Sequence, residues 1–589
     1  MQEACGTPTY VLVEKIVAPF ENVPEDWAVH GTTGYRFANV VNGLFVDHAA
    51  EARLTRTYHA FIGNEDTFEE IARRSKRLIL RTALASELTV LTNRLARIAR
   101  ADRNTRDFTF TTLREGLTEV ITAFPVYRTY VDEHVRPEDR KYVDWAVAQA
   151  KAENRAADVS VFDFLRDVLT CELPVRSPRM AAAVRHFARK FQQLTSPVMA
   201  KGVEDTSFYI FNRLLSLNDV GGDPQEFGFP AARFHRASSH RARHWPHTML
   251  ATSTHDNKRS EDVRARIDVI SEKVPEWRLQ LRKWSRMNDV HRSEVDGVPA
   301  PSRNDEYLLY QTLLGSFPLD GSPLAEYTDR ILAYMQKAMR EAKQHSSWAN
   351  VNEPYEAAVQ RYVRALLNEH SGAAFLEDLR AAATPVAWTG YLNGLSMVTV
   401  KLTSPGVPDT YQGNEVWDFS LVDPDNRRPV DYERRRALLG ELESLEAPLE
   451  QPLADMLRSL PDGRAKLYVL WRLLQLRKAR EALFLHGGYT AVRTTGLRAR
   501  HLLCFARRHG GESIVTVAPR LIGGLDLAPG DLPCGAVWGE TRIETPFFKD
   551  GTVLQDVLSG REHRVSRSGL LAADALALFP TAVLVGRGS

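Results

Sequence analysis

PTYVLVEKIVAPFE, residues 8–21, is the stretch that decides the fold class. The run from Tyr10 to Val13 is apolar throughout and includes β-branched and aromatic residues, as in a strand covered on both faces of a parallel sheet. It ends on Glu14 and Lys15. Because α/β barrels carry their active sites at the carboxyl ends of their strands, this pattern predicts an α/β fold with Glu14 at a functional site.

A second stretch of this kind is TMLATSTHDNKRSED, residues 248–262, which predicts a strand that ends on His255 and Asp256 and leads into a helix. It crowds a hydroxyl, an imidazole, a carboxylate and two cations into six positions. These residues are Thr254, His255, Asp256, Lys258 and Arg259.

Both acidic residues also have a purely structural interpretation. Glu14 could form an ion pair with Lys15 at the strand end. Asp256 could be the N-cap of a helix that begins near Ser260 or Glu261. Spacing alone leaves both alternatives open, although a helix cap does not need the polar residues that surround Asp256.

The segment 49–243 has a helical pattern, in which apolar residues recur at intervals of three and four. We expect a large, mostly helical insertion here. Its charge run Arg73, Arg74, Lys76 and Arg77 is interpreted as the solvated face of a helix.

The remaining segments divide by composition. Residues 1–48 hold the first strand and its loop, 244–440 the rest of an α/β barrel, and 441–486 a helical connection. From residue 487 to 589 the sequence alternates and turns often, which predicts a small antiparallel β domain.

Composition excludes several classes of protein. The 589 residues carry a formal net charge of +2, which gives no field that favours nucleic acid. No stretch is long and apolar enough to predict a membrane span. The cysteines Cys5, Cys171, Cys504 and Cys534 are far apart and lack metal-ligand or redox spacing, so free thiols in the cytoplasm are expected, with no metal and no cofactor.

The residues around Asp256 suit a polar, uncharged ligand. A carboxylate beside a neutral imidazole can hydrogen-bond sugar hydroxyls, and fixed cations can hold further hydroxyls. Several aromatic residues could stack on sugar rings or could equally be core residues. They are Trp27, Tyr35, Phe37, Trp245, Tyr411 and Trp417.

Four long motifs resemble those of the maltooligosyltrehalose synthases, a branch of the α-amylase superfamily. They are VEKIVAPFENVPEDWAVHGTTGYRFANVVNGLFVD, MAKGVEDTSFYIFNRLLSLNDVGG, STHDNKRSEDVRARI and SPGVPDTYQGNEVWDFSLVDPDNRRPVDYE. The resemblance extends from Val13 to Glu433. It implies the C-terminal half of a (β/α)8 barrel with a large helical insertion, followed by the antiparallel β domain.

The resemblance also implies a reaction. The α-1,4 bond at the reducing end of a maltooligosaccharide is remade as an α,α-1,1 bond by a retaining, intramolecular transglycosylation. Glu14 matches the family's acid/base on strand five, and Asp256 the transition-state stabiliser on strand seven. His255 is expected at the reacting ring, and Lys258 and Lys201 at the reducing-end subsites. From the residues themselves, Tyr35 and Arg259 are expected to bind the substrate as well.

The chain departs from the family pattern at two places. Arg36 stands where the family suggests Asp, and no Asp precedes Glu14 within the 13 residues before it. Since the superfamily carries its nucleophile on strand four, we expect the chain to be a fragment, a subunit completed by a separate N-terminal barrel half, or a noncatalytic α-glucan-binding remnant.

The expected partners follow from the same resemblance. The substrate would be a maltooligosaccharide, and a maltooligosyltrehalose trehalohydrolase would act on the product. The helical insertion would act as a lid that keeps water from the reacting sugar. An α-glucan hydrolase of the same superfamily is the alternative enzyme.

Overall fold

The computed structural model describes residues 9–154, 158–174, 177–525, 527–528 and 530–587. Residues 1–8, including Cys5, lie outside this range. Cys171, Cys504 and Cys534 are free thiols. Of the helices in the described ranges, none combines the length and the apolar character that crossing a bilayer requires.

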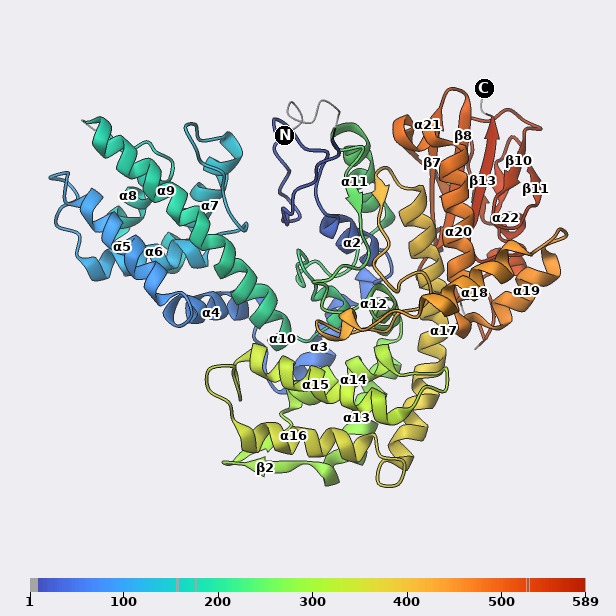
Figure 1. The fold of residues 1–589 in the computed structure, drawn as a ribbon, viewed down its shortest axis with the longest axis horizontal. Coiled ribbons are helices and arrows are strands. Elements are labelled where there is room, and N and C mark those ends of the chain that lie inside the picture. The colour runs from blue at the N-terminus through green and yellow to red at the C-terminus, as the bar shows by residue number, and fades with distance from the viewer. Residues whose placement is uncertain (1–8, 155–157, 175–176, 526, 529, 588–589) are drawn as a thin grey trace.

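Figure 1 shows the helical lobe at the left, a second group of helices below, and the C-terminal sheet at the right. The lobe has an apolar core of its own, built by α5–α9. Its helices are α4 (Phe68–Arg81), α5 (Ala85–Ala99), α6 (Phe110–Thr122), α7 (Pro137–Glu153), α8 (Val159–Leu169) and α9 (Pro178–Met199).

The charge run on α4 is partly a solvated face, as predicted, and its arginines also form ion pairs. Arg73, Arg74 and Arg77 each have an acidic partner. Lys76 is buried and donates to the carbonyl oxygens of Thr122 and Phe124, so the predicted solvated face is wrong for this residue. Burial lowers the pKa of Lys76 to about 8.

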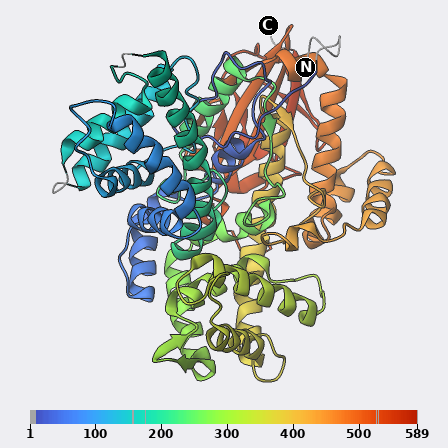
Figure 2. The same cartoon turned by 60° about the vertical axis from the view of Figure 1, so that its left-hand side comes forward.

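The remaining helices lie at the centre, in the group below and beside the C-terminal sheet, and Figure 2 shows them from the side of the lobe. Those before residue 300 are α2 (Tyr35–Asn42), α3 (Glu51–Ile62), α10 (Phe208–Ile210), α11 (Ala231–His244), α12 (Glu261–Asp268) and α13 (Val274–Asn288). The later ones are α14 (Arg303–Ser316), α15 (Leu324–Ala342), α16 (Glu353–Leu366), α17 (Ala373–Thr403), α18 (Tyr432–Glu443), α19 (Glu450–Arg458), α20 (Arg464–Ala479), α21 (Glu481–His486) and α22 (Ala572–Ala575).

Four short extended segments lie side by side at the centre. Val13 forms a parallel bridge with Thr32, and β1 (Met249–Leu250) pairs in parallel with β4 (Val407–Pro408). Met249 N–H donates to Thr32 O at 3.2 Å, which joins the two pairs. The predicted strands at Tyr10–Val13 and near His255 are thus present only as these short pairings.

Two glycines allow these segments to approach closely. Gly34 has φ +92°, and a Cβ at this position would lie 2.5 Å from Ala251 N. At Gly31 a Cβ would lie 2.3 Å from Thr248 Cβ. No other residue type tolerates both the backbone conformation and the contact at Gly34. The turn formed by residues 31–34, the GTTG turn, is therefore held against β1.

The helix after Asp256 is fixed by buried ion pairs. Lys466 of α20 lies 2.7 Å from Glu261 Oε1 and 2.8 Å from Asp262 Oδ2, both in the first turn of α12. All three residues are buried. Because breaking such a network leaves an unpaired buried charge, α20 holds α12 in place.

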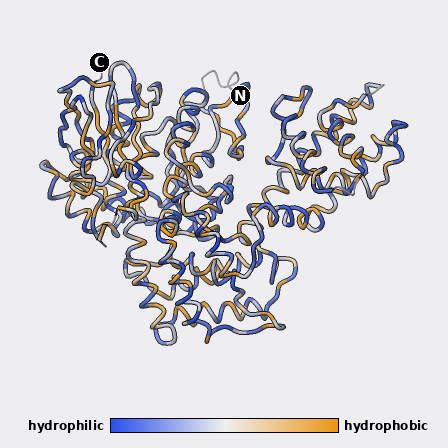
Figure 3. Tube along the Cα trace, turned by 180° about the vertical axis from the view of Figure 1, so that it is seen from behind, coloured by the Kyte–Doolittle hydropathy of each residue, from blue (hydrophilic) through white to orange (hydrophobic). Residues whose placement is uncertain are grey.

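The C-terminal region is antiparallel, as predicted. Its main sheet has the order β11-β10-β13-β8-β7-β5, and the hydrophobic trace of its strands is visible from behind in Figure 3. The strands of this sheet are β5 (Gly488–Ala491), β7 (Leu502–His509), β8 (Glu512–Pro519), β10 (Val553–Asp556), β11 (Glu562–Arg564) and β13 (Ala582–Arg587). A smaller sheet contains β6 (Thr494–Thr495), β9 (Arg542–Ile543) and β12 (Leu570–Leu571), and β2 (Ser293–Val295) pairs with β3 (Val298–Ala300).

We predict that Gly34→Ala destabilises the fold much more than Gly63→Ala. Both glycines have positive φ, but a Cβ at Gly63 meets nothing within 4 Å. The backbone strain alone costs about 1–2 kcal/mol, and the contact with Ala251 should raise the cost at Gly34 to about 3–4 kcal/mol. Urea unfolding of the two variants measures the difference. Equal losses would contradict the close approach.

Candidate functional site

Glu14 is exposed and free of the ion pair proposed for it as an alternative. Lys15 is buried and pairs with Glu21, whose pKa is raised by burial although Lys15 opposes the shift. The side chain of Glu14 has no ion pair or hydrogen bond within the described part of the chain. The purely structural interpretation of Glu14 is therefore wrong.

Tyr35, at the start of α2, connects the two predicted acidic positions. Burial raises the pKa of its hydroxyl, and the charges of Asp256, Glu14 and Asp219 raise it further. The Thr254 hydroxyl donates to Tyr35 Oη at 3.5 Å. Glu14 and Asp256 are thus both near enough to raise the pKa of one phenol, although they are far apart in sequence.

Asp256 is half-buried and does not cap the following helix. Ser260 is the N-cap of α12, and its hydroxyl accepts from Val263 N–H. The N-cap interpretation of Asp256 is therefore wrong, whereas the predicted start of the helix at Glu261 is confirmed. Burial raises the pKa of Asp256, with further increases from Asp205 and Asp219.

His255 is exposed beside Asp256, and its backbone carbonyl accepts from Asn426 Nδ2 at 3.0 Å. Its charge, when present, lowers the pKa of Asp256 and so acts against burial. The imidazole itself has no hydrogen bond to the described residues. It is available to a ligand at the same face as Asp256.

A π-helix, η2 (Ala200–Ser207), brings three charged residues to the site. The hydroxyls of Thr206 and Ser207 donate to carbonyls five residues earlier, at 2.7 and 2.8 Å, which suits the wider turn. Such turns occur frequently at functional sites. The motif MAKGVEDTSFY contains this segment, but its spacing gives no sign of the altered helix.

Asp205 links the two lysines that the sequence singled out. Lys201 Nζ lies 2.7 Å from one of its oxygens and Lys258 Nζ 2.9 Å from the other. Burial alone would lower the pKa of Lys258, but Tyr209, Asp205 and Glu204 raise it. Asp205 therefore holds both lysines as cations, and Lys258 in turn lowers the pKa of Asp256.

Glu204 is a buried carboxyl group that sequence reasoning missed. Burial raises its pKa to about 7, and Asp256 raises it as well, while Lys258 opposes the shift. Tyr127 donates to one Glu204 oxygen, and Gly221 N–H donates to the same oxygen at 2.9 Å. Its position next to Asp205 in MAKGVEDTSFY is the signal that could have found it.

Arg259 lies behind the site rather than in it. Its guanidinium is buried and donates to Leu215 O at 3.2 Å and to Tyr334 Oη at 2.8 Å. The carboxylate of Asp219 is also held by protein partners, since it accepts from Asn257 Nδ2 at 2.7 Å and from Arg264 Nη1 at 3.1 Å. Arg259 and Asp219 thus hold in place the backbone next to Asp256.

Arg36 has a structural task at the position where the resemblance suggests Asp. Its guanidinium donates to the carbonyl oxygens of Ala18 and Pro19 at 3.0 and 2.5 Å. Burial lowers its pKa. Arg36 thus fixes the loop that follows Glu14.

Two of the aromatic residues suggested for stacking on sugar rings make contacts within the protein. Phe37 is buried in the core, and Trp417 Nε1 donates to Leu460 O at 2.5 Å. Trp27 packs edge-on against Tyr130. In the described residues, no group of three or more His, Cys, Asp or Glu side chains could hold a metal ion.

Two carboxyl groups in the loops that follow paired parallel segments are the kind of arrangement found in enzymes that act on glycosidic bonds. No protein-family model matches the chain. A Mycobacterium tuberculosis protein named as a maltooligosyl trehalose synthase is 33% identical over 521 residues, with 88% of this chain and 60% of the relative covered.

Solved structures agree with this likeness. Maltooligosyltrehalose synthase from Arthrobacter ramosus is 33% identical, with a TM-score of 0.80, and covers 99% of this chain and 67% of its own. Another maltooligosyl trehalose synthase is 28% identical with a TM-score of 0.73, covering 99% of this chain and 66% of its own. The chain belongs to the maltooligosyltrehalose synthase family. It spans 60% of the length of the curated relative that it matches.

We predict that Glu204→Gln flattens the pH dependence of stability. The pKa of Glu204 is about 7 in the fold against an ordinary 4.5, so the folded state binds the proton more tightly. The resulting stabilisation is complete below the ordinary value and is lost as pH rises through the folded pKa. Between about pH 5 and 8, the free energy of unfolding should fall by about 1–3 kcal/mol less in the variant than in the wild type.

Urea unfolding at several pH values measures this effect, and Glu65→Gln, an exposed position with the same exchange, is the control. An unchanged slope for Glu204→Gln would contradict a protonated Glu204 at neutral pH.

Proposed function

We propose that this chain supplies part of the active site of a maltooligosyltrehalose synthase. This part contains the acid/base residue and the residues that bind the glucose at the reducing end. The enzyme would convert the terminal α-1,4 bond of a maltooligosaccharide into an α,α-1,1 bond. The observation that carries this proposal is the pairing of the segments that precede Glu14, Tyr35 and Asp256, together with the Thr254–Tyr35 hydrogen bond, in a chain of this family.

Glu14 would give a proton to the leaving glycosidic oxygen and later take one from the attacking anomeric hydroxyl. Its exposure and its freedom from protein partners support this role, because an acid/base must reach the substrate. Asp256 would stabilise the positive charge that develops on the reacting ring, and His255 would hold one of its hydroxyls. Tyr35 would contact the same ring.

Lys201 and Lys258 would hold hydroxyls of the glucose at the reducing end. This glucose must stay bound while it turns over and attacks through its anomeric oxygen. The two ion pairs to Asp205 support the proposal, since they hold the ammonium groups in fixed positions. Arg259 would act through the backbone that it supports.

A retaining reaction also needs a nucleophilic carboxylate, and the neighbouring acids are unsuited to it. Asp219 is held by Arg264, Asp205 by two lysines, and Glu204 by Tyr127. We infer that the nucleophile comes from a segment outside this cluster. The four parallel segments would then be strands five to eight of a barrel, completed by strands one to four.

The helical insertion would exclude water from the reacting glucose. Tyr127 of the helical lobe donates to Glu204 of the π-helix, and the charge of Asp256 raises the pKa of both, which supports a lobe that reaches the site. Exclusion of water is what separates an isomerising enzyme from a hydrolase. The alternatives are an α-glucan hydrolase and a subunit that only binds α-glucan.

Maltopentaose tests the proposed reaction. We mix the 589-residue chain with the part of the Arthrobacter ramosus enzyme that the chain does not cover, and measure reducing ends and free glucose. Reducing ends should disappear with little release of glucose. Glu14→Gln should lower the rate by about 10²–10⁴-fold, because it removes the proton transfer, while Glu65→Gln should not.

The chain without this partner should bind maltopentaose but show no turnover. Rapid turnover by the chain alone would contradict an external nucleophile, and a rise in reducing ends would favour the hydrolase.

A further inference from the structure

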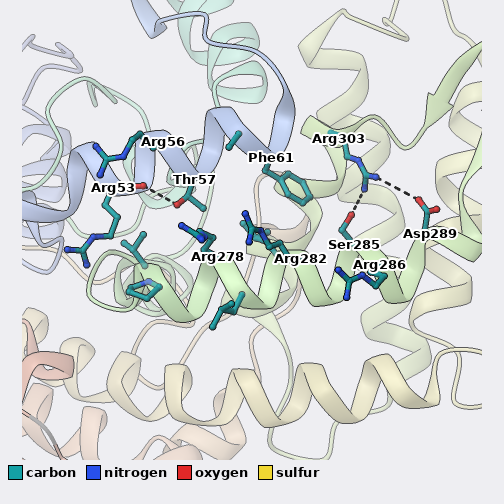
Figure 4. Close-up of a pocket in the computed structure, with 15 residues that line it drawn as sticks. Arg53, Arg56, Thr57, Phe61, Arg278, Arg282, Ser285, Arg286, Asp289 and Arg303 are labelled. Atoms are coloured by element: carbon teal, nitrogen blue, oxygen red, sulfur yellow. Dashed lines mark hydrogen bonds and ion pairs between the residues drawn. The ribbon is translucent and has the colours of Figure 1, made fainter.

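We propose that the cleft between α3 and α13 binds a chain of phosphoryl groups, as found in a nucleoside triphosphate or in inorganic tripolyphosphate. The cleft has a volume of about 1070 Å³ and shares no lining residue with the proposed glycan site. Figure 4 shows that its two walls are the facing sides of these helices.

The walls carry an unusual concentration of arginine. Arg53 and Arg56 come from α3, and Arg278, Arg282 and Arg286 come from α13. All five are exposed to the cleft, and none forms an ion pair or hydrogen bond through its guanidinium to a described residue. In Figure 4, Arg278 and Arg282 point from α13 toward α3.

The arginines on α4 differ from those of the cleft. On α4, Arg73, Arg74 and Arg77 each have an acidic partner. The acidic residue of the cleft, Asp289, lies within 3.4 Å of Arg292 and 3.8 Å of Arg303 and is thus already neutralised. The cleft therefore gathers positive charge that no protein carboxylate balances.

A concave surface of one charge focuses its field and attracts a ligand of the opposite charge. Guanidinium groups bind phosphate oxygens in pairs, with a planar geometry that lysine lacks. Arg278, Arg282 and Arg286 are four residues apart, so they lie on one face of α13 over about 12 Å. This spacing suits several linked phosphoryl groups better than one phosphate.

The cleft also has an apolar part. Phe61 from α3 and Val274, Pro275 and Leu279 from α13 line it. Leu279 has 64% of its surface exposed, which is high for a large apolar residue. A nucleobase or sugar attached to the phosphoryl groups could cover this surface, so a nucleotide and inorganic tripolyphosphate are both tested.

The experiment measures the binding of tripolyphosphate and of ATP without metal to the full chain by calorimetry and by the shift in Tm. At low ionic strength both ligands should bind, and salt near physiological strength should weaken the binding. Tighter binding of ATP would identify a nucleotide site, and equal binding an inorganic phosphate site.

Arg278→Gln with Arg282→Gln should weaken the binding of tripolyphosphate at least about tenfold, because each exchange removes a charged hydrogen bond. Arg53→Gln with Arg56→Gln, on the other wall, should do the same. Without ligand, the Tm of both double variants should be no lower than that of the wild type, since only unpaired like charges are removed. Arg97→Gln with Arg100→Gln, two exposed arginines of the distant lobe, is the matched control and should bind normally.

Two results would overturn the proposal. The first is no binding of either ligand to the wild type at low ionic strength, or equal weakening in the control. The second is that a glutamate-rich peptide binds as tightly as tripolyphosphate, which would make the cleft a docking surface for acidic protein segments.

Discussion

The close approach of the GTTG turn to β1 is the constraint on which the rest of the site depends. Gly31 and Gly34 bring the turn against residues 248–251, and the hydrogen bonds from Val13 to Gly31 and from Met249 to Thr32 align the segments. Glu14 follows Val13 directly, Tyr35 lies three residues after Thr32, and Asp256 lies six residues after the end of β1. These residues, far apart in sequence, come into one region because the short backbone segments that precede them pair with one another.

A second feature of the site is that its acidic side chains lie in different surroundings. Glu14 is exposed, Asp256 is half-buried, Asp205 lies between two lysines, and Glu204 is buried with a pKa of about 7. Carboxyl groups in different surroundings can hold different protonation states at one pH, which is how a single site provides both an acid and a base. Lys258 contributes by remaining charged inside the protein.

The sequence predicted the helix that follows Asp256, because an apolar run that ends in charged residues and leads into a helical pattern is easily recognised, whereas the roles of Glu14 and Asp256 stay predictions. It also predicted the antiparallel C-terminal region from alternation and turns. It could not predict the π-helix at Lys201, the burial of Lys76 or the role of Asp205, since these depend on packing between distant segments. Arg259 illustrates the same limit, because its charge indicated a ligand contact and the fold buries it beneath the site.

A crystal structure of the Glu14→Gln chain with maltopentaose tests the central claim most directly, because this exchange removes proton transfer and leaves the shape of the site intact. We expect a glucose ring between residue 14 and Asp256 and against Tyr35, with the reducing-end glucose near Lys201 and Lys258. A maltopentaose bound away from these residues, with Asp256 and Tyr35 free of sugar, would contradict it.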